Sequence, residues 1–259
     1  MAFKRKPRAK RPVRKRIYRK KVGVSKSVKA YVKRTISSNI ENKIHVDYAT
    51  NQNIVTAAGG TNFTHRGLLP ALSQGVTANQ RIGNEVKVKS AIVRGSLNLL
   101  LYNAITNPNP VPAYVMVWIV RSKLKNQLFS SSNAPNDFFD IGNSAVGPQG
   151  NLLDTMFPIN KQSWICYYKR KFKIGAGVTT GGNISGNPDN SSFCQSFYIN
   201  YTKHLKKLKY DDSTTGGQTI PVNTNINIVF QCVSCDGQAS SAFVMSEYHM
   251  TNTIIYEDA

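Results

Sequence analysis

The first thirty-four residues most constrain what this chain can fold into. Residues 1–34 contain sixteen lysines and arginines and no aspartate or glutamate. The whole chain has a formal net charge of +21. Residues 1–34 are about an eighth of its length and carry about three quarters of this excess positive charge. Such a block repels itself and has little apolar surface to bury, so it cannot form a core alone. It requires a polyanion, and the rest of the chain is expected to present it.

We interpret residues 1–40 as a basic N-terminal arm whose cations bind nucleic acid, because Lys and Arg neutralise phosphate. Pro7 and Pro12 favour an extended segment up to residue 23. Dense Lys/Arg clusters are also typical of nuclear localisation signals. A merely solubilising tail needs fewer uncompensated cations. The candidate ligands are Lys4, Arg5, Lys6, Arg8, Lys10, Arg11, Arg14, Lys15, Arg16, Arg19, Lys20, Lys21, Lys26, Lys29, Lys33 and Arg34.

Residues 25–38 differ from the rest of the arm, which is otherwise predicted to be disordered. Their apolar side chains recur at helical spacing and predict a short amphipathic helix with a basic outer face, capped by Ser25 or Ser27. Two tyrosines of the arm, Tyr18 and Tyr31, could stack on bases. Anchoring to a core is an equally good interpretation for Tyr31. The apolar positions are Val24, Val28, Tyr31, Val32 and Ile36.

Residues 41–259 are predicted to form one all-β domain with a net charge of only +5. Asn, Ser, Thr and Gly are abundant between the apolar runs, which favours strands joined by long polar loops. Residues 57–84 and 122–161 are predicted to be loops, and a loop as long as the second is normally functional or lies at an interface. Eight strands without a long helix indicate a single antiparallel jelly roll of two packed sheets. The predicted strands are 43–48, 85–102, 113–120, 164–174, 193–201, 205–210, 225–233 and 243–256.

The alternation within these strands predicts their buried faces. Ile44, Val46 and Tyr48 share one side of the first strand. The apolar alternation changes phase near residues 90–95, which predicts a bulge or bend in the longest strand. Residues 113–120 are wholly apolar, so this strand is expected to be covered on one side by the core and on the other by another subunit.

One further strand, 164–174, has a basic face. Its alternation places Cys166, Tyr168, Phe172 and Ile174 on one side. Lys169, Lys171 and Lys173 lie on the other side and complete the candidate nucleic-acid ligands. Such a face is either solvated or directed at phosphate, and both interpretations remain open.

The sequence contains few residues suited to catalysis or metal binding. Its four histidines are widely scattered, without an HxH, HExxH or GxSxG arrangement, so no enzyme activity and no catalytic residue are expected. Cys232 and Cys235 have metal or redox spacing but lack a second pair, so thiols packed in or beside a strand are expected, with no metal and no cofactor. No apolar run approaches a membrane span, so membrane insertion is not expected.

Several short segments follow one another in a characteristic order along most of the chain. They are the Lys/Arg-rich start, Arg81 to Lys89 (RIGNEVKVK) leading into Arg94-Gly95, Lys169 to Phe172 (KRKF), Lys203 to Tyr210 (KHLKKLKY) and the closing Ile255 to Asp258 (IYED). Their order is more specific than any one of them. Taken together, they resemble the capsid proteins of circovirus-like, circular Rep-encoding single-stranded DNA (CRESS-DNA) viruses.

The resemblance implies a jelly-roll subunit that assembles with itself, as sixty copies, into a small icosahedral shell around circular single-stranded DNA. The arm would line the interior and act as a nuclear-import signal, which implies the host import machinery as a partner and both virion and host nucleus as locations. Exposed loops would contact a host receptor that the sequence does not identify. The alternative is a non-capsid nucleic-acid-binding protein of the viral movement, nuclear-shuttle or single-strand-binding type, which shares the arm and β-body.

Overall fold

The chain divides into two compact units, residues 1–40 and 41–259, which are described separately. The structure is a computed structural model. It describes residues 24–39, 42–56, 63–75, 77, 80–100, 112–123, 135–175, 193–211, 220–235 and 243–258. In the first unit, α1 (Lys26–Asn39) confirms the predicted helix, and the Val28 backbone N–H donates to the Ser25 hydroxyl, 3.3 Å away, so Ser25 caps it.

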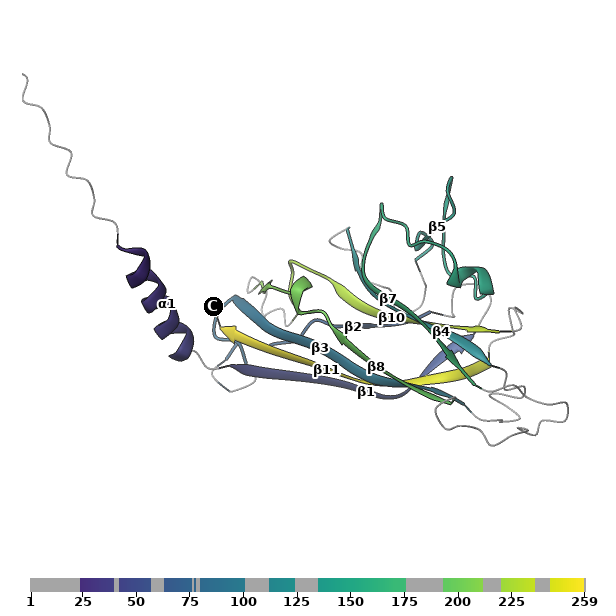
Figure 1. Cartoon of the computed structure of the whole chain (residues 1–259), viewed down its shortest axis with the longest axis horizontal. Helices are drawn as coiled ribbons and strands as arrows, with labels where there is room; N and C mark the ends of the chain where they lie inside the picture. The colour runs from purple at the N-terminus through teal and green to yellow at the C-terminus, as the bar shows by residue number, and fades with distance from the viewer. Residues whose placement is uncertain are drawn as a thin grey trace, which may run out of the picture. The chain divides into compact units, whose positions relative to one another are not determined.

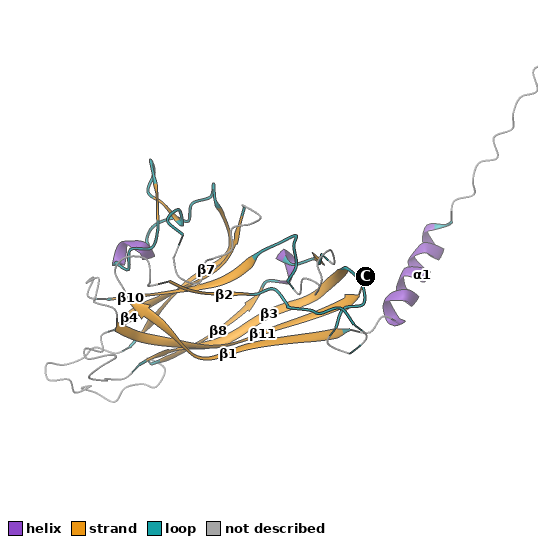
Figure 2. Cartoon of the chain, turned by 180° about the vertical axis from the view of Figure 1, so that it is seen from behind, coloured by secondary structure: helices purple, strands orange, loops and turns teal. Residues whose placement is uncertain are grey.

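The described part of the second unit contains a five-stranded and a four-stranded antiparallel sheet, stacked in Figures 1 and 2. The lower layer in Figure 1, here called the first sheet, has the order β1 (Lys43–Thr56), β11 (Phe243–Asp258), β3 (Glu85–Leu99), β8 (Cys194–Asn200). The second sheet has the order β2 (Phe63–Gly67), β10 (Ile226–Ser234), β4 (Ala113–Ser122), β7 (Trp164–Ile174). Strands from the two ends of the domain are neighbours in both sheets, as in two nested Greek keys. The predicted all-β jelly roll is confirmed.

The main core lies between the sheets and follows from their alternation. In β3, Val86 and Val88 point inward, and a register shift opposite residues 88–90 moves the inward positions to Ala91 and Val93. This irregularity is the predicted phase change in the longest strand. In β10 and β11, apolar side chains at alternate positions also point inward. These core residues are Ile226, Ile228, Phe230, Cys232, Tyr248, Met250, Ile254 and Tyr256.

A second apolar cluster lies on the outer face of β4. The inward side chains of β4 belong to the main core, whereas Met116, Trp118 and Val120 point away from it and are also buried. They pack beneath residues 135–163, which contain β5 (Phe139–Asp140), β6 (Ala145–Val146) and the 3₁₀ turn η1 (Leu152–Thr155). Figure 1 shows this segment above the second sheet. The predicted burial of both faces is confirmed, but the cover comes from the same chain rather than another subunit.

The number of jelly-roll strands was predicted correctly, but not their identity. β2 lies within residues 57–84, which were predicted to be a loop, and it pairs with β10 at the edge of the second sheet. Residues 205–210, predicted to be one of the eight, contain only the short β9 (Lys207–Lys209), which pairs with the start of β3. A 3₁₀ turn, η3 (Thr202–His204), connects β8 to this segment.

The predicted buried face of β1 is wrong. Ile44, Val46 and Tyr48 are 52, 54 and 68% exposed on the outer face of the first sheet. β1 is an edge strand whose inward side carries Asp47, and this carboxylate binds the Arg66 guanidinium of β2 through two contacts of 2.6 and 2.9 Å. A register shift after Ala49, where Asn51 has a φ of +51°, then turns Ile54 into the core.

The predicted alternation of β7 fails at one residue. Phe172 and Ile174 are buried in the main core, as expected. A register shift leaves Tyr167 without a partner on β4, because Tyr168 pairs with Ile119 and Cys166 with Val120. Cys166 is therefore exposed on the lysine-bearing face rather than inside.

Candidate nucleic-acid interface

Only part of the basic arm falls within the described residues. Lys26 and Lys29 are exposed on α1. Lys33 and Arg34 belong to the same helix, but their side chains are not described. The helix also exposes Tyr31, at 71%. The predicted ligands from Lys4 to Lys21, and with them Tyr18, lie outside the described residues, so their assignment stays a prediction.

The three predicted lysines of β7 do share one face. Lys169, Lys171 and Lys173 are exposed and lie opposite Trp118, Met116 and Tyr114 of β4. The Lys171 ammonium lies 4.7 Å from the centre of the Tyr114 ring. Lys169 donates to the Phe157 carbonyl at 3.2 Å, and partial burial lowers its pKa. The hydrogen bond to Phe157 and the partial burial leave Lys169 less available to an anion than Lys171 and Lys173.

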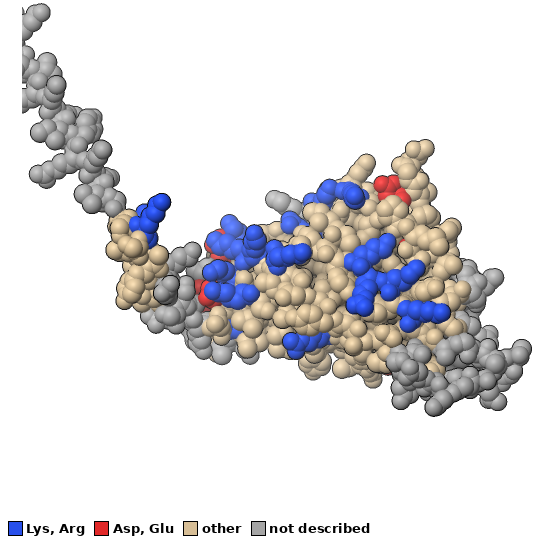
Figure 3. Space-filling model, in the orientation of Figure 1, with Lys and Arg blue, Asp and Glu red and all other residues tan. Residues whose placement is uncertain are grey.

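A second basic surface, which we call the lysine cluster, was not singled out from the sequence. It consists of Lys87, Lys89, Lys207 and Lys209. They meet because Lys87 pairs with Lys207 and Glu85 pairs with Lys209 across β3 and β9. Figure 3 shows basic side chains gathered near the C-terminal end of the body and again over β7. The alternation of lysine and apolar residues in both segments was visible in the sequence, but their pairing was not.

Two carboxylates partly neutralise the lysine cluster. Glu257 contacts Lys87 and Lys89, and Glu85 contacts Lys207 and Lys209. The hydrogen bond from Lys89 contributes most to lowering the pKa of Glu257, and that from Lys207 does the same for Glu85. Four cations against two carboxylates leave a positive surplus, which a phosphate backbone can neutralise.

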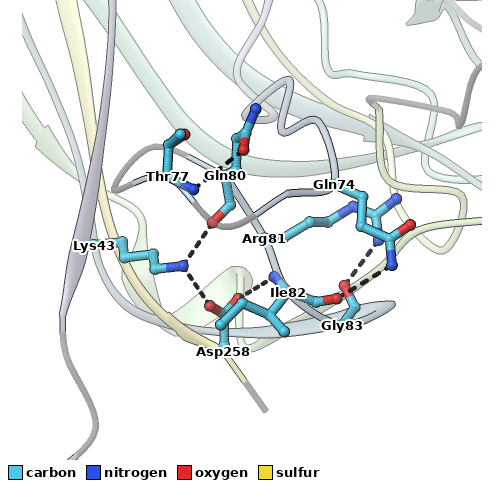
Figure 4. A network of polar contacts seen from close by, with 8 residues as sticks. All are labelled: Lys43, Gln74, Thr77, Gln80, Arg81, Ile82, Gly83 and Asp258. Carbon is cyan, nitrogen blue, oxygen red and sulfur yellow. Dashed lines mark hydrogen bonds and ion pairs between the residues drawn. The ribbon is translucent and has the colours of Figure 1, made fainter.

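A network of polar contacts, drawn in Figure 4, fixes the end of the body at which β1 begins. The Lys43 ammonium is 2.7 Å from the Asp258 carboxylate and donates to the Gln80 carbonyl, also at 2.7 Å. The other Asp258 oxygen accepts the Ile82 N–H at 3.3 Å. Arg81 is buried, donates to the Gly83 carbonyl at 2.8 Å and stacks over Tyr210. Residues of the RIGNEVKVK segment therefore anchor the loop before β3.

The described residues offer little for other chemistries. Within them, no group of three or more His, Cys, Asp or Glu side chains is arranged to hold a metal ion. Cys232 is packed in the main core as expected, and burial raises the pKa of its thiol to about 12. Among the described helices, none is sufficiently long and apolar to cross a membrane.

Comparisons with known proteins find distant matches among solved structures. No protein-family model matches the chain, and no curated protein matches it. Among solved structures, a chain from Desmodium yellow mottle tymovirus aligns with a TM-score of 0.31 and 13% identity. The alignment covers 84% of this chain and 89% of that chain.

Proposed function

We propose that this chain is a viral capsid protein that assembles with itself into a small icosahedral shell and packages circular single-stranded DNA. The observation that carries the proposal is the attachment of sixteen uncompensated cations to a jelly-roll body. The jelly roll is a common fold of viral capsid subunits, although lectins and cupins share it. The arm supplies what a shell subunit needs to neutralise a packaged polyanion.

The division of charge between arm and body supports this assignment. The body has a net charge of only +5, so subunits can approach one another without strong repulsion. If sixty copies assemble, their arms bring about 960 positive charges into one particle. Binding of this kind neutralises phosphates, tolerates any sequence and weakens steeply with salt. The same arm serves as the signal for import into the host nucleus, where the shell would assemble before release as a virion.

The proposal is tested first by electron microscopy of the full-length protein, purified without other viral components. Closed, uniform, small icosahedral particles are expected. Monomers or small oligomers at every salt and nucleic-acid condition would contradict shell assembly. They would instead favour the movement, shuttle or single-strand-binding type of protein.

Removal of residues 1–34 tests the role of the arm. Single-stranded DNA binding should fall by orders of magnitude at moderate salt, and the slope of log affinity against log salt should become shallow. Circular dichroism should show the β-body still folded. A matched variant with every arm arginine changed to lysine keeps the charge and should retain most of the affinity. Unchanged affinity after the deletion would show that the main site is elsewhere.

A further inference from the structure

The outer face of the first sheet carries exposed apolar side chains that no described residue covers. Ile44, Val46 and Tyr48 follow one another along β1, and Tyr198 of β8 is 54% exposed. Strand pairing places Tyr48, Thr251, Arg94 and Tyr198 in one row across β1, β11, β3 and β8. Exposed apolar side chains gathered on one face of a sheet indicate a candidate binding surface. We call this surface the tyrosine face.

Arg94 and the two tyrosines form the centre of this face. The Arg94 guanidinium lies 5.4 Å from the centre of the Tyr198 ring, and it forms no ion pair with any described carboxylate. Between Arg94 and Tyr48 is a shallow hollow of about 450 Å³, which Ser96, His249 and Thr251 also line. Three strand spacings separate the two tyrosines, which is about 14 Å. Two π-faces with a cation between them suit bases joined by a phosphate backbone.

The charges around the tyrosine face also favour a polyanion. Toward the start of β1 the same sheet carries the lysine cluster, with Lys87 paired to Glu257 across β3 and β11. Among the described residues, the other carboxylate on this face, outside the lysine cluster, is Glu247, which is engaged by His249 and Asn98. A symmetric contact with a second copy would place Arg94 and the lysines of each copy near those of the other, at a cost in repulsion.

We infer that the tyrosine face binds single-stranded nucleic acid, with bases stacked on Tyr48 and Tyr198 and phosphates neutralised by Arg94 and the lysine cluster. This inference rests on the proposed function for its ligand but assigns a second site, distinct from the arm. Sequence continuity supports the assignment, since β1 begins at Lys43, three residues after the basic unit ends at residue 40. The arm would bind mainly by charge, whereas this face adds stacking contacts that salt screens little.

Photocrosslinking of the full-length protein tests the inference directly. Single-stranded DNA containing 5-iodouracil is bound, irradiated and digested, and the crosslinked peptides are identified by mass spectrometry. Crosslinks at Tyr48 and Tyr198 are expected. Crosslinks confined to arm residues such as Tyr18 or Tyr31 would overturn the inference while leaving the proposed function intact. Failure to bind single-stranded DNA at all would overturn both.

Substitutions separate stacking from charge. Tyr48→Leu and Tyr198→Leu should each weaken binding at least about fivefold, without changing its salt dependence. Lys87→Gln and Lys207→Gln should instead each reduce the salt slope by about one. Arg170 supplies a matched control, because it too stacks over a ring, that of Phe172, but on the other sheet. Arg94→Ala should reduce crosslinking at Tyr198, and Arg170→Ala should not.

A second copy of the chain is the competing occupant. If the tyrosine face is a subunit contact, Tyr48→Leu and Tyr198→Leu will reduce particle assembly, and neither tyrosine will crosslink to DNA in assembled particles. That combination overturns the inference. Normal particle assembly by the two tyrosine variants, together with weaker DNA binding whose salt dependence is unchanged, supports the inference.

Discussion

Lys43 and Asp258 are separated by 215 positions in the sequence, yet the ammonium and carboxylate lie 2.7 Å apart. Their side chains are 8 and 18% exposed. Lys43 begins β1 and Asp258 ends β11, so the pair joins the first and last strands of the jelly roll at the end where the sequence enters from the arm. The contacts to Gln80 and Ile82 extend this attachment to the loop before β3.

Asp258→Asn should lower the free energy of unfolding by about 1–3 kcal/mol, because it leaves a largely buried ammonium without its charged partner. Urea unfolding of purified subunits measures this value. Lys207→Gln is the control, since it breaks an ion pair whose lysine side chain is 51% exposed. Its expected cost is below about 1 kcal/mol. Equal costs for the two variants would contradict the structural role assigned to Asp258.

Gly95→Ala should destabilise the body strongly. A Cβ at Gly95 would lie 2.2 Å from the His249 carbonyl oxygen and 2.5 Å from the Phe197 ring, so β3 would have to separate from its neighbours. The expected loss is about 1–3 kcal/mol or more, measured as a lower urea midpoint. Gly67→Ala is the matched control in β2, where the nearest atom would be 3.8 Å away. A similar loss in both variants would show that the clash is not the cause.

Asp154 should make stability depend on pH. It is a buried residue of η1, within the segment that covers β4, and this burial raises its pKa despite hydrogen bonds from Gly150, Gln231 and Gln149. The folded state therefore binds this proton more tightly than the unfolded state does. Its contribution to stability is greatest below the unfolded pKa and is lost as pH rises through the folded pKa.

Asp154→Asn should remove that contribution, and the difference from the parent protein should vary across mildly acidic pH. The comparison is needed because Glu85 and Glu257 act in the opposite direction. Their lowered pKa values favour folding at higher pH. Urea unfolding at a series of pH values measures the difference. A constant difference at all pH values would rule out titration of Asp154.

Lys171→Glu combined with Lys173→Glu tests the basic face of β7. If this face lines the interior of a shell, particles should package less nucleic acid and show a lower ratio of absorbance at 260 nm to that at 280 nm. Lys169 is left unchanged because it bonds to the Phe157 carbonyl. Lys161→Glu, at an exposed lysine of the covering segment, is the control. An unchanged ratio would place the β7 face outside the particle or within a subunit contact.

The sequence was a good guide where alternation in a long strand coincided with burial between the sheets. This holds for the described part of β3, where the apolar alternation and its change of phase near residues 90–95 match the buried positions. It failed for β2, because the sequence FTHRG has only one large apolar residue and its strand conformation depends on pairing with β10. Residues 205–210 alternate equally well but have only the start of β3 to pair with.

The candidate site shows the same limits. Alternation correctly grouped the lysines of β7, because consecutive odd positions of one strand share a face. The lysine cluster depends on long-range pairing of β3 with β9 and β11, which local patterns do not specify. The exposed face of β1 was misassigned because Asp47 has a partner, Arg66, that lies on another sheet. An edge strand can therefore turn its polar side inward.

The double burial of β4 has a consequence for the order of events in the life of the subunit. Residues 135–163 of the same chain cover Trp118 and its neighbours on β4. The outer face of β4 is therefore buried without a contact from another molecule. If the chain assembles as proposed, a newly made copy can therefore complete its folding before it meets another. Assembly would then depend on contacts between folded surfaces and on the charge of the arm, and not on burial of the β4 side chains.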